Sequence, residues 1–102
     1  MKKYLSFDIG GTNLKYALID EKGQIIEKDR VKTSTENLDA FMESMYQVAD
    51  KYQAQFEGIA ICAPGKIDTE NKIIYFGGAL KFLDGLNLQE ALWDKYNVPI
   101  SV

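Results

Sequence analysis

The feature that most constrains the fold lies near the N-terminus, where two apolar segments are joined by a very short connection. Residues 5–9 (Leu-Ser-Phe-Asp-Ile) and 14–17 (Leu-Lys-Tyr-Ala) flank the sequence Gly-Gly-Thr-Asn. Alternating apolar and polar residues on both sides of such a connection are typical of a β-hairpin. We therefore expect a sheet that is built outward from this hairpin.

The connection also has the chemistry of an anion-binding loop. Gly10 and Gly11 carry no Cβ, so the backbone can approach a polyphosphate, and we expect positive φ angles that turn successive N–H groups toward one anion. We predict that Thr12 adds a hydroxyl donor and Lys15 a positive charge. Asp8, at the end of the first strand, is predicted to hold Mg²⁺ through water. The alternative, a tight turn that binds nothing, requires only the glycines.

Two common nucleotide-binding motifs do not occur here. The sequence contains no G-x-x-x-x-G-K-[ST] and no G-x-G-x-x-G that opens a helix. Residues 8–15 (Asp-Ile-Gly-Gly-Thr-Asn-Leu-Lys) instead resemble the first phosphate loop of the actin-like, hexokinase-type ATPases. The form is most similar to that of the ROK family of bacterial sugar kinases, repressors and open reading frames.

Two further segments strengthen this resemblance. Residues 58–68 (Gly-Ile-Ala-Ile-Cys-Ala-Pro-Gly-Lys-Ile-Asp) resemble the family's buried strand, its Pro-Gly turn and its hydrophobic-Asp hairpin. Residues 97–102 resemble the strand that leads into the family's Glu-Asn-Asp-Ala-Asn motif. The resemblance thus extends from Tyr4 to Val102.

The resemblance implies an α/β fold of the ribonuclease H-like (actin-like ATPase) type, with a mixed five-stranded sheet in the order β-β-β-α-β-α-β. It implies that residues 1–102 form the N-terminal lobe of an ATP-dependent sugar kinase of the glucokinase, N-acetylhexosamine or fructose kinase type. ATP and Mg²⁺ would be its cofactors, and a sugar and the C-terminal lobe its partners. In the family the general base is an aspartate of the motif expected after Val102. No catalytic residue is therefore assigned within the chain, and the chain alone is expected to be inactive.

Periodicity in the first half predicts the same order of elements. Alternation predicts strands over 4–9, 14–19 and 24–31, with turn residues at 20–23. Residues 33–36 (Thr-Ser-Thr-Glu) have the form of a capping box. A stripe of apolar residues at helical spacing follows, made of Leu38, Phe41, Met42, Met45, Val48 and Tyr52.

The second half continues the pattern. The apolar run 59–63 predicts a central strand covered on both faces, in which Cys62 is a buried structural thiol. Asn87, with Glu90 three residues later, is predicted to start a second helix. Residues 98–102 then form the fifth strand.

The segment between the Pro-Gly turn and the second helix is expected to meet the sugar. Residues 65–68 and 71–75 are predicted to pair as a small hairpin, followed by a loop over 77–85. In the family this loop usually carries Pro-Asn-Leu, whose asparagine lies near the sugar, and the best match here has no asparagine. The candidate sugar-lining residues are Gly65, Gly77, Gly78 and Ala79. The alternative is a solvent loop whose glycines only permit turns.

Composition further narrows the possible partners, metal sites and cellular location of the protein. A formal net charge of -3 and scattered lysines argue against a nucleic-acid partner. The single cysteine excludes an internal disulfide and a cysteine-based zinc site within these residues. We expect a cytoplasmic protein without a membrane partner, because no export signal and no spanning apolar run occur. Whether identical chains associate into a homo-oligomer is left open.

Two alternative functions belong to other classes. A transcriptional repressor of the family would carry a helix-turn-helix ahead of the phosphate loop, whereas here the first strand starts at once. A sugar-sensing protein that binds without phosphorylating is compatible with the missing asparagine. The residues after Val102 would distinguish a kinase from a sensor. The sequence Glu-Asn-Asp there supports a kinase, whereas a substitution of that aspartate supports a sensor.

Overall fold

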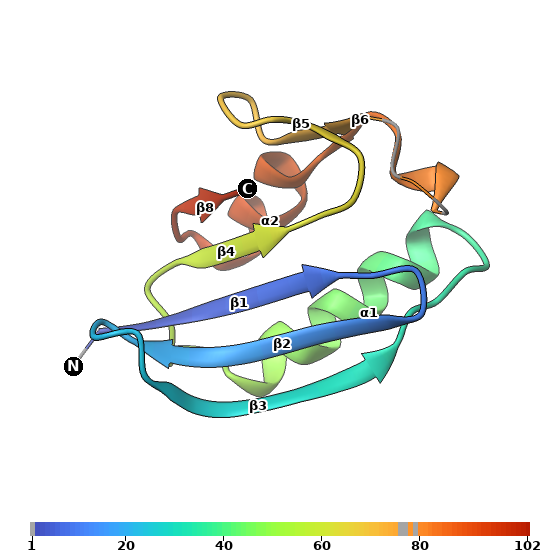
Figure 1. The fold of residues 1–102 in the computed structure, drawn as a ribbon. Coiled ribbons are helices and arrows are strands. Elements are labelled where there is room, and N and C mark those ends of the chain that lie inside the picture. Colours follow the sequence, from blue (N-terminus) through green and yellow to red (C-terminus); the bar gives the residue numbers. More distant parts are fainter. Residues whose placement is uncertain (1, 76–77, 79) are drawn as a thin grey trace.

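The computed structural model describes residues 2–75, 78 and 80–102, which form two sheets and two α-helices (Figure 1). The elements, in chain order, are β1 (Lys3–Ile9), β2 (Asn13–Asp20), β3 (Ile25–Lys32), α1 (Leu38–Lys51), β4 (Ile59–Cys62), β5 (Lys66–Asp68), β6 (Ile73–Tyr75), the 3-10 helix η1 (Lys81–Leu83), β7 (Leu86–Asn87), α2 (Leu88–Tyr96) and β8 (Ile100–Ser101). Among the described residues, no helix is both long and apolar enough to cross a membrane.

The larger sheet has five strands in the order β3-β2-β1-β4-β8. β1, β2 and β3 form an antiparallel meander, while β4 pairs parallel to β1 and β8 parallel to β4. The parallel pairs follow from the helical connections, because α1 returns the chain to start β4 beside β1, and α2 does the same for β8. The predicted mixed five-stranded sheet is confirmed, although β8 is shorter than the predicted strand 98–102.

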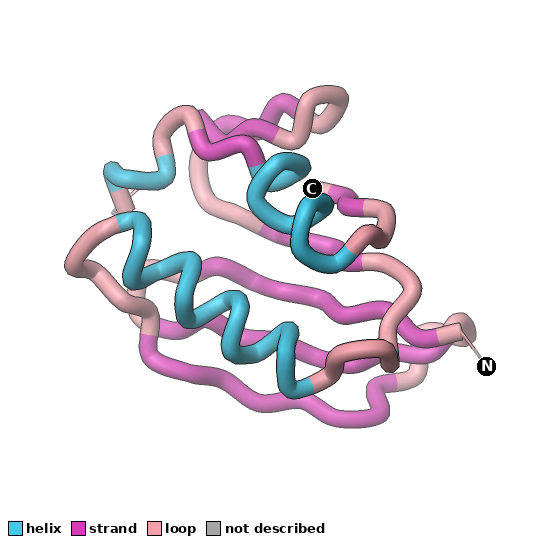
Figure 2. Tube along the Cα trace, turned by 180° about the vertical axis from the view of Figure 1, so that it is seen from behind, coloured by secondary structure: helices cyan, strands magenta, loops and turns pink. Residues whose placement is uncertain are grey.

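Both helices pack on the same face of this sheet (Figure 2). The core between the two layers consists of side chains that alternate along the strands and recur at helical spacing on α1. Its most buried members include Leu5, Phe7, Leu14, Leu18, Phe41, Met45, Leu88 and Leu92. Each side chain of this size stabilises the fold by about 1.5–3 kcal/mol when it leaves water. The apolar stripe predicted for the first helix is therefore confirmed.

The opposite face of the sheet is open in the described chain. Along β4, Ile59 and Ile61 are buried, whereas Ala60 and Cys62 are exposed. Successive side chains of a strand point to opposite faces, and the two helices cover only one of them. The expectation that residues 59–63 are covered on both faces, with a buried Cys62, is wrong for this reason.

The start of α1 also differs from the prediction. The helix is capped by Asn37, whose side-chain oxygen accepts a hydrogen bond from the backbone N–H of Ala40 at 2.8 Å. Residues 33–36 are not its capping box, because the chain remains extended beyond them. α2 begins as predicted, with the Asn87 side chain accepting from the N–H of Glu90 at 3.1 Å.

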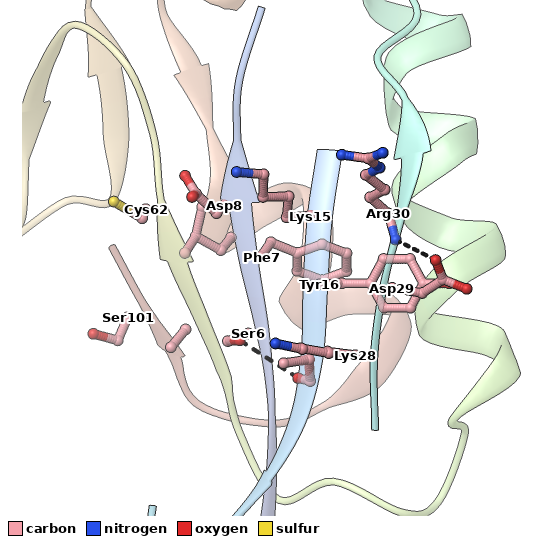
Figure 3. Close-up of a pocket in the computed structure, with 13 residues that line it drawn as sticks. Ser6, Phe7, Asp8, Lys15, Tyr16, Lys28, Asp29, Arg30, Cys62 and Ser101 are labelled. Atoms are coloured by element: carbon pink, nitrogen blue, oxygen red, sulfur yellow. Dashed lines mark hydrogen bonds between the residues drawn. The ribbon is translucent and has the colours of Figure 1, made fainter. Parts of the chain in front are cut away.

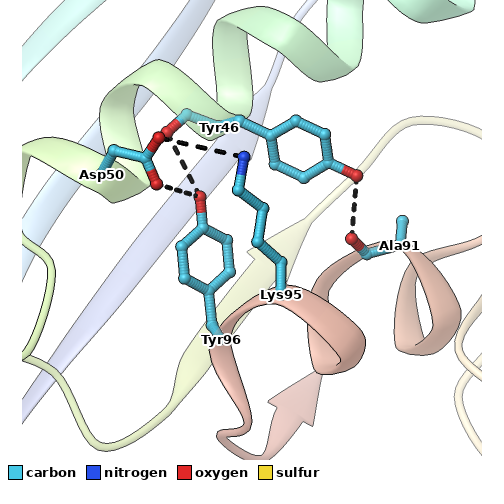
Figure 4. Close-up of polar contacts among 5 residues, drawn as sticks. All are labelled: Tyr46, Asp50, Ala91, Lys95 and Tyr96. Atoms are coloured by element: carbon cyan, nitrogen blue, oxygen red, sulfur yellow. Dashed lines mark hydrogen bonds and ion pairs between the residues drawn. The ribbon is translucent and has the colours of Figure 1, made fainter.

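A polar cluster joins the two helices on the side away from the sheet (Figure 4). The Tyr46 hydroxyl on α1 donates to the carbonyl of Ala91 on α2 at 2.9 Å. The Tyr96 hydroxyl on α2 donates in the other direction, to the Asp50 carboxylate at 2.9 Å. The Lys95 ammonium lies 4.1 Å from the centroid of the Tyr46 ring. These contacts fix the position of α2, and hence that of β8, relative to α1.

The smaller sheet has the order β5-β6-β7 and lies beyond the C-terminal end of β4. β5 and β6 form the predicted hairpin, whereas β7 is not foreseen by the sequence pattern. The turn between β5 and β6 is closed by Asp68, whose carboxylate accepts hydrogen bonds from the backbone N–H groups of Glu70 and Asn71. Hydrogen bonds from Asn71 lower the pKa of the Asp68 carboxyl.

Candidate functional site

The loop between β1 and β2 is a tight connection in which Gly10 has a steric role. The Gly10 N–H donates to the carbonyl of Asn13 at 3.1 Å, and a Cβ at Gly10 would lie 2.9 Å from that same oxygen. A larger residue would push the two limbs of the hairpin apart. Neither Gly10 nor Gly11 has a positive φ, so the expected left-handed conformation is wrong. Close approach of the backbone is what requires glycine at position 10.

Thr33, which follows β3, holds both limbs of this loop. Its hydroxyl donates to the carbonyl of Gly10 at 2.7 Å, and its backbone N–H donates to the carbonyl of Thr12 at 2.9 Å. The Thr33 side chain is only 4% exposed. The carbonyls of Gly10 and Thr12 are therefore bonded toward the body of the fold.

The loop N–H groups are available for a ligand. Gly11 and Thr12 are exposed, and within the part of the chain that the structure describes their N–H groups donate to no protein atom. In a planar trans peptide the C=O and N–H point in opposite directions, so the Gly11 N–H is directed away from Thr33. Two free N–H groups and the Thr12 hydroxyl at one loop are donors that suit a phosphate.

Charged side chains lie in one row across the open face, next to this loop (Figure 3). The strand register places Asp8 directly opposite Lys15 on β2, and Lys15 directly opposite Arg30 on β3. On the other side Asp8 is paired with Cys62 of β4. Among the described residues the Asp8 carboxylate has no hydrogen bond or ion pair. The sequence-based prediction missed Arg30, which only the pairing of β2 with β3 brings to this row.

Next to the charged row, the open face has a depression of about 780 Å³. Small side chains form its floor because Ala17, Ser6, Ala60 and Ser101 occupy matching positions on four neighbouring strands. The charged row forms part of its wall, since Asp8, Lys15 and Arg30 also line it.

The segments predicted to line a sugar site meet at the end of β4. Gly65, in the turn after β4, has a φ of 89°, a conformation that favours glycine. Gly78 has a φ of 65°, and a Cβ built on it would lie 3.4 Å from the Cβ of Pro64. The loop after β6 therefore touches the Pro-Gly turn. Gly77 and Ala79 lie outside the described residues.

Both candidate segments are at one edge of the larger sheet. β1 and β4 are parallel neighbours, so the loop after β1 and the Pro64-Gly65 turn after β4 emerge at the same edge. Ligands of open α/β sheets bind at the carboxyl ends of such strands. Gly65, one of the predicted sugar-lining residues, thus lies at the strand end next to the predicted phosphate loop.

The donor set fits a magnesium ion that arrives with a nucleotide. Among the described residues no group of three or more His, Cys, Asp or Glu side chains is arranged to hold a metal ion. Mg²⁺ is commonly held by one or two carboxylates together with substrate phosphates and water. Asp8, unpaired beside the donor-rich loop, is the carboxylate placed for that role.

The mixed sheet β3-β2-β1-β4-β8, with the hairpin loop 10–12 at the carboxyl end of β1, is an α/β lobe of the actin-like ATPase type. The model of the ROK family matches residues 4–102, and the chain belongs to this family. The predicted family and fold class are confirmed.

Several curated relatives are named as sugar kinases. The beta-glucoside kinase of Klebsiella pneumoniae is 33% identical over 100 residues, which cover 98% of this chain and 33% of the relative. The glucokinase of Thermotoga maritima is 34% identical over 79 residues, covering 72% of this chain and 24% of the relative. The chain thus spans a third or less of the length of these relatives.

Solved structures share the fold. The Lmo2764 protein of Listeria monocytogenes superposes with a TM-score of 0.87 at 31% identity, covering 97% of this chain and 34% of that one. A ROK family glucokinase of Streptomyces griseus, solved with glucose and AMPPNP, superposes with a TM-score of 0.85 at 20% identity, covering 98% of this chain and 32% of that one. A ROK family transcriptional regulator superposes with a TM-score of 0.83 at 20% identity, covering 98% of this chain and 27% of that one. The last two likenesses show the fold alone.

Proposed function

We propose that this chain is the N-terminal lobe of an ATP-dependent sugar kinase, which transfers the γ-phosphoryl group of ATP to a sugar hydroxyl. The observation that carries the proposal is the loop 10–12, whose exposed N–H groups are unpaired beside the unpaired carboxylate of Asp8. The two curated relatives described above are named as sugar kinases, which supports the same class.

The loop binds the phosphates in this proposal. The backbone of Gly10 and Gly11 lets the phosphate chain approach, the free N–H groups and the Thr12 hydroxyl donate to its oxygens, and Lys15 adds positive charge. Arg30, next to Lys15 in the same row, adds a second cation. Positioning and charge neutralisation provide most of the rate in phosphoryl transfer, so these contacts matter more than covalent chemistry.

In this proposal Asp8 would hold a magnesium ion through water. When bound, Mg²⁺ neutralises charge on the phosphate oxygens as it develops during transfer. The carboxylate suits this role because it is exposed and has no competing basic partner at ion-pair distance in the described residues.

The sugar is proposed to lie at the neighbouring strand end. Gly65, which follows Pro64, and Gly78, whose Cβ position lies 3.4 Å from the Pro64 Cβ, would form part of its pocket. The sequence-based prediction adds Gly77 and Ala79, which lie outside the described residues. The acceptor of the sugar hydroxyl proton would come from outside residues 1–102. Glucose, an N-acetylhexosamine, fructose and a β-glucoside are the substrates to compare, in keeping with the sequence-based prediction and the relatives' names.

A sugar-sensing or regulatory protein of the family is the second candidate. The observation that favours it is the fold shared with a ROK family transcriptional regulator, which shows that this lobe also occurs in proteins named as regulators. The two candidates differ in turnover, since a sensor binds sugar without consuming ATP.

The decisive experiment measures ADP release by the full-length protein with Mg²⁺-ATP and each of the four sugars. Sugar-dependent turnover that is lost in Asp8→Asn and kept in Asp94→Asn supports the kinase. Asp94 is an exposed carboxylate on α2, so its variant is the matched control. Sugar binding in calorimetry without any ADP release would replace the kinase with the sensor.

A further inference from the structure

We propose that Thr33 is a positioning residue for the phosphate-binding loop, and that its hydroxyl orients the N–H of Gly11 before a polyphosphate arrives. This inference rests on the proposed function, because it assumes that the loop binds phosphate. It goes beyond that function in assigning a role to a residue that touches neither nucleotide nor sugar in the proposal.

The two hydrogen bonds of Thr33 reach both limbs of the hairpin loop. The hydroxyl bonds the carbonyl of Gly10, on the limb that leaves β1, at 2.7 Å. The backbone N–H bonds the carbonyl of Thr12, on the limb that enters β2, at 2.9 Å. The direct hydrogen bond between the two limbs runs from the Gly10 N–H to the Asn13 carbonyl. It does not involve the carbonyls of Gly10 and Thr12, which accept from Thr33.

The hydroxyl bond of Thr33 determines where one of the two free loop donors, the Gly11 N–H, points. The carbonyl of Gly10 shares a planar trans peptide with the N–H of Gly11, so the bond to the Thr33 hydroxyl directs that N–H to the opposite side. The carbonyl of Thr12 is related in the same way to the N–H of Asn13. With the Gly10 and Thr12 carbonyls held by Thr33, the loop presents the Gly11 N–H in place of the Gly10 carbonyl oxygen, which would repel a phosphate.

The hydroxyl of Thr33 has no other structural task among the described residues. Although it precedes α1 closely, the helix is capped by Asn37. Thr33 is 4% exposed, so its hydroxyl is shielded from water that would compete for the Gly10 carbonyl. A buried hydroxyl that bonds one loop carbonyl is suited to preorganisation, which lowers the cost of ordering a binding site.

The test compares three variants of the full-length protein. Thr33→Val keeps the β-branched shape and the backbone N–H but removes the hydroxyl, and Thr33→Ser keeps the hydroxyl. Thr35→Val makes the same chemical change two residues away, at an exposed threonine whose hydroxyl makes no hydrogen bond among the described residues, and is the matched control. Calorimetry gives the Kd for Mg²⁺-AMPPNP, for adenosine and for the sugar.

We expect Thr33→Val to weaken AMPPNP binding about tenfold, the effect of losing one hydrogen bond. Adenosine and sugar binding should stay unchanged, Thr33→Ser should restore AMPPNP binding, and Thr35→Val should match the wild type. In turnover, the KM for ATP should rise while the KM for sugar does not. A general structural role would move all three ligands together.

Two results would overturn the inference in distinguishable ways. If the wild-type protein binds AMPPNP and Thr33→Val binds it equally tightly, the loop does not need Thr33 and the proposed function stands. If the wild-type protein binds no AMPPNP, the proposed function fails and the inference fails with it. Should Thr33→Val not fold, the pair Thr33→Ala and Thr33→Ser replaces it, since both shorten the side chain and only serine keeps the hydroxyl.

Discussion

Asp8 and Lys15 lie directly opposite each other on β1 and β2, and both side chains project from the sheet face that the helices leave open. Opposite charges at such a cross-strand position stabilise a sheet modestly when they interact. Here no ion pair joins them, although the structure describes both side chains. An exposed carboxylate that is left unpaired next to a donor-rich loop contributes little to the fold, and this frees it for a ligand.

The first prediction concerns Asp8→Asn in the full-length protein. Because the carboxylate makes no hydrogen bond or ion pair within the described chain, we expect the melting temperature to stay nearly unchanged. Phosphoryl transfer should fall by several powers of ten, since metal-assisted charge neutralisation contributes several kcal/mol and each 1.36 kcal/mol is a factor of ten in rate. Thermal melting and kcat, measured on the same preparation, provide the check.

The opposite pattern would remove Asp8 from the site. A loss of about 1 kcal/mol in the free energy of unfolding with an unchanged kcat would mean that the carboxylate only supports the Gly10-Gly11 turn. The control variant Asp94→Asn should change neither quantity.

The second prediction concerns Gly10→Ala. The added Cβ would lie 2.9 Å from the Asn13 carbonyl oxygen, a backbone atom that cannot move without opening the hairpin. We expect a loss of about 1–3 kcal/mol in the free energy of unfolding, as for other overpacked sites, together with weaker AMPPNP binding. Chemical denaturation and calorimetry measure the two effects.

Gly23→Ala is the matched control for that variant. Gly23 has a φ of 82° and open space around the position of its Cβ, in the turn between β2 and β3. Alanine there should cost about 1–2 kcal/mol because of the left-handed backbone alone, with AMPPNP binding unchanged. Equal losses of AMPPNP binding in both glycine variants would show that the loop around Gly10 has no special part in binding.

The sequence predicted the order of the main elements because local patterns determine it. The alternation in β1 and β2 and the helical stripe of α1 each bury one face, and the short connection at 10–12 permits only a hairpin. The site residues at the strand ends followed from the same pattern together with the family resemblance. The hydrogen bond from Thr33 to Gly10 and the position of Arg30 beside Lys15 could not be predicted from the sequence, because both depend on the register of β3 against β2.

Two expectations, the strand 59–63 covered on both faces and the capping box at 33–36, failed because tertiary contacts decide both features. Residues 59–63 are apolar throughout, and periodicity cannot tell whether one face or two is covered when small residues such as Ala60 and Cys62 alternate with isoleucines. Likewise, Thr-Ser-Thr-Glu has the composition of a capping box, but tertiary hydrogen bonding engages Thr33 with the loop and moves the start of α1 to Asn37.

The third prediction tests the corrected start of α1. Asn37→Ala should lower the free energy of unfolding by about 1 kcal/mol, the usual cost of losing an N-cap side chain, because the N–H of Ala40 loses its acceptor. Ser34→Ala should have little effect, since it lies outside the cap. Denaturant titrations of both variants measure the difference, and a larger cost for Ser34→Ala would favour the capping box after all.

The fourth prediction is alkaline destabilisation through Tyr96. Burial and the neighbouring Asp50 carboxylate raise the pKa of the Tyr96 hydroxyl above its ordinary value of 10.0. The folded state thus holds this proton more tightly than the unfolded state does. The stabilisation is fully present below about pH 10, and it is lost as the pH rises above that value, because the unfolded chain then ionises more readily.

Tyr96→Phe isolates this contribution, because it removes the titrating group together with its hydrogen bond to Asp50. At pH 8 the variant should be less stable by about 0.5–1.5 kcal/mol, the usual net contribution of one hydrogen bond. Between about pH 10 and 11.5 its free energy of unfolding should fall less steeply than that of the wild type. Tyr75→Phe, at an exposed tyrosine of β6, is the control and should keep the wild-type slope. Parallel slopes for Tyr96→Phe and the wild type would show that the Tyr96 hydroxyl titrates equally in both states, so that the bond between α1 and α2 does not protect it.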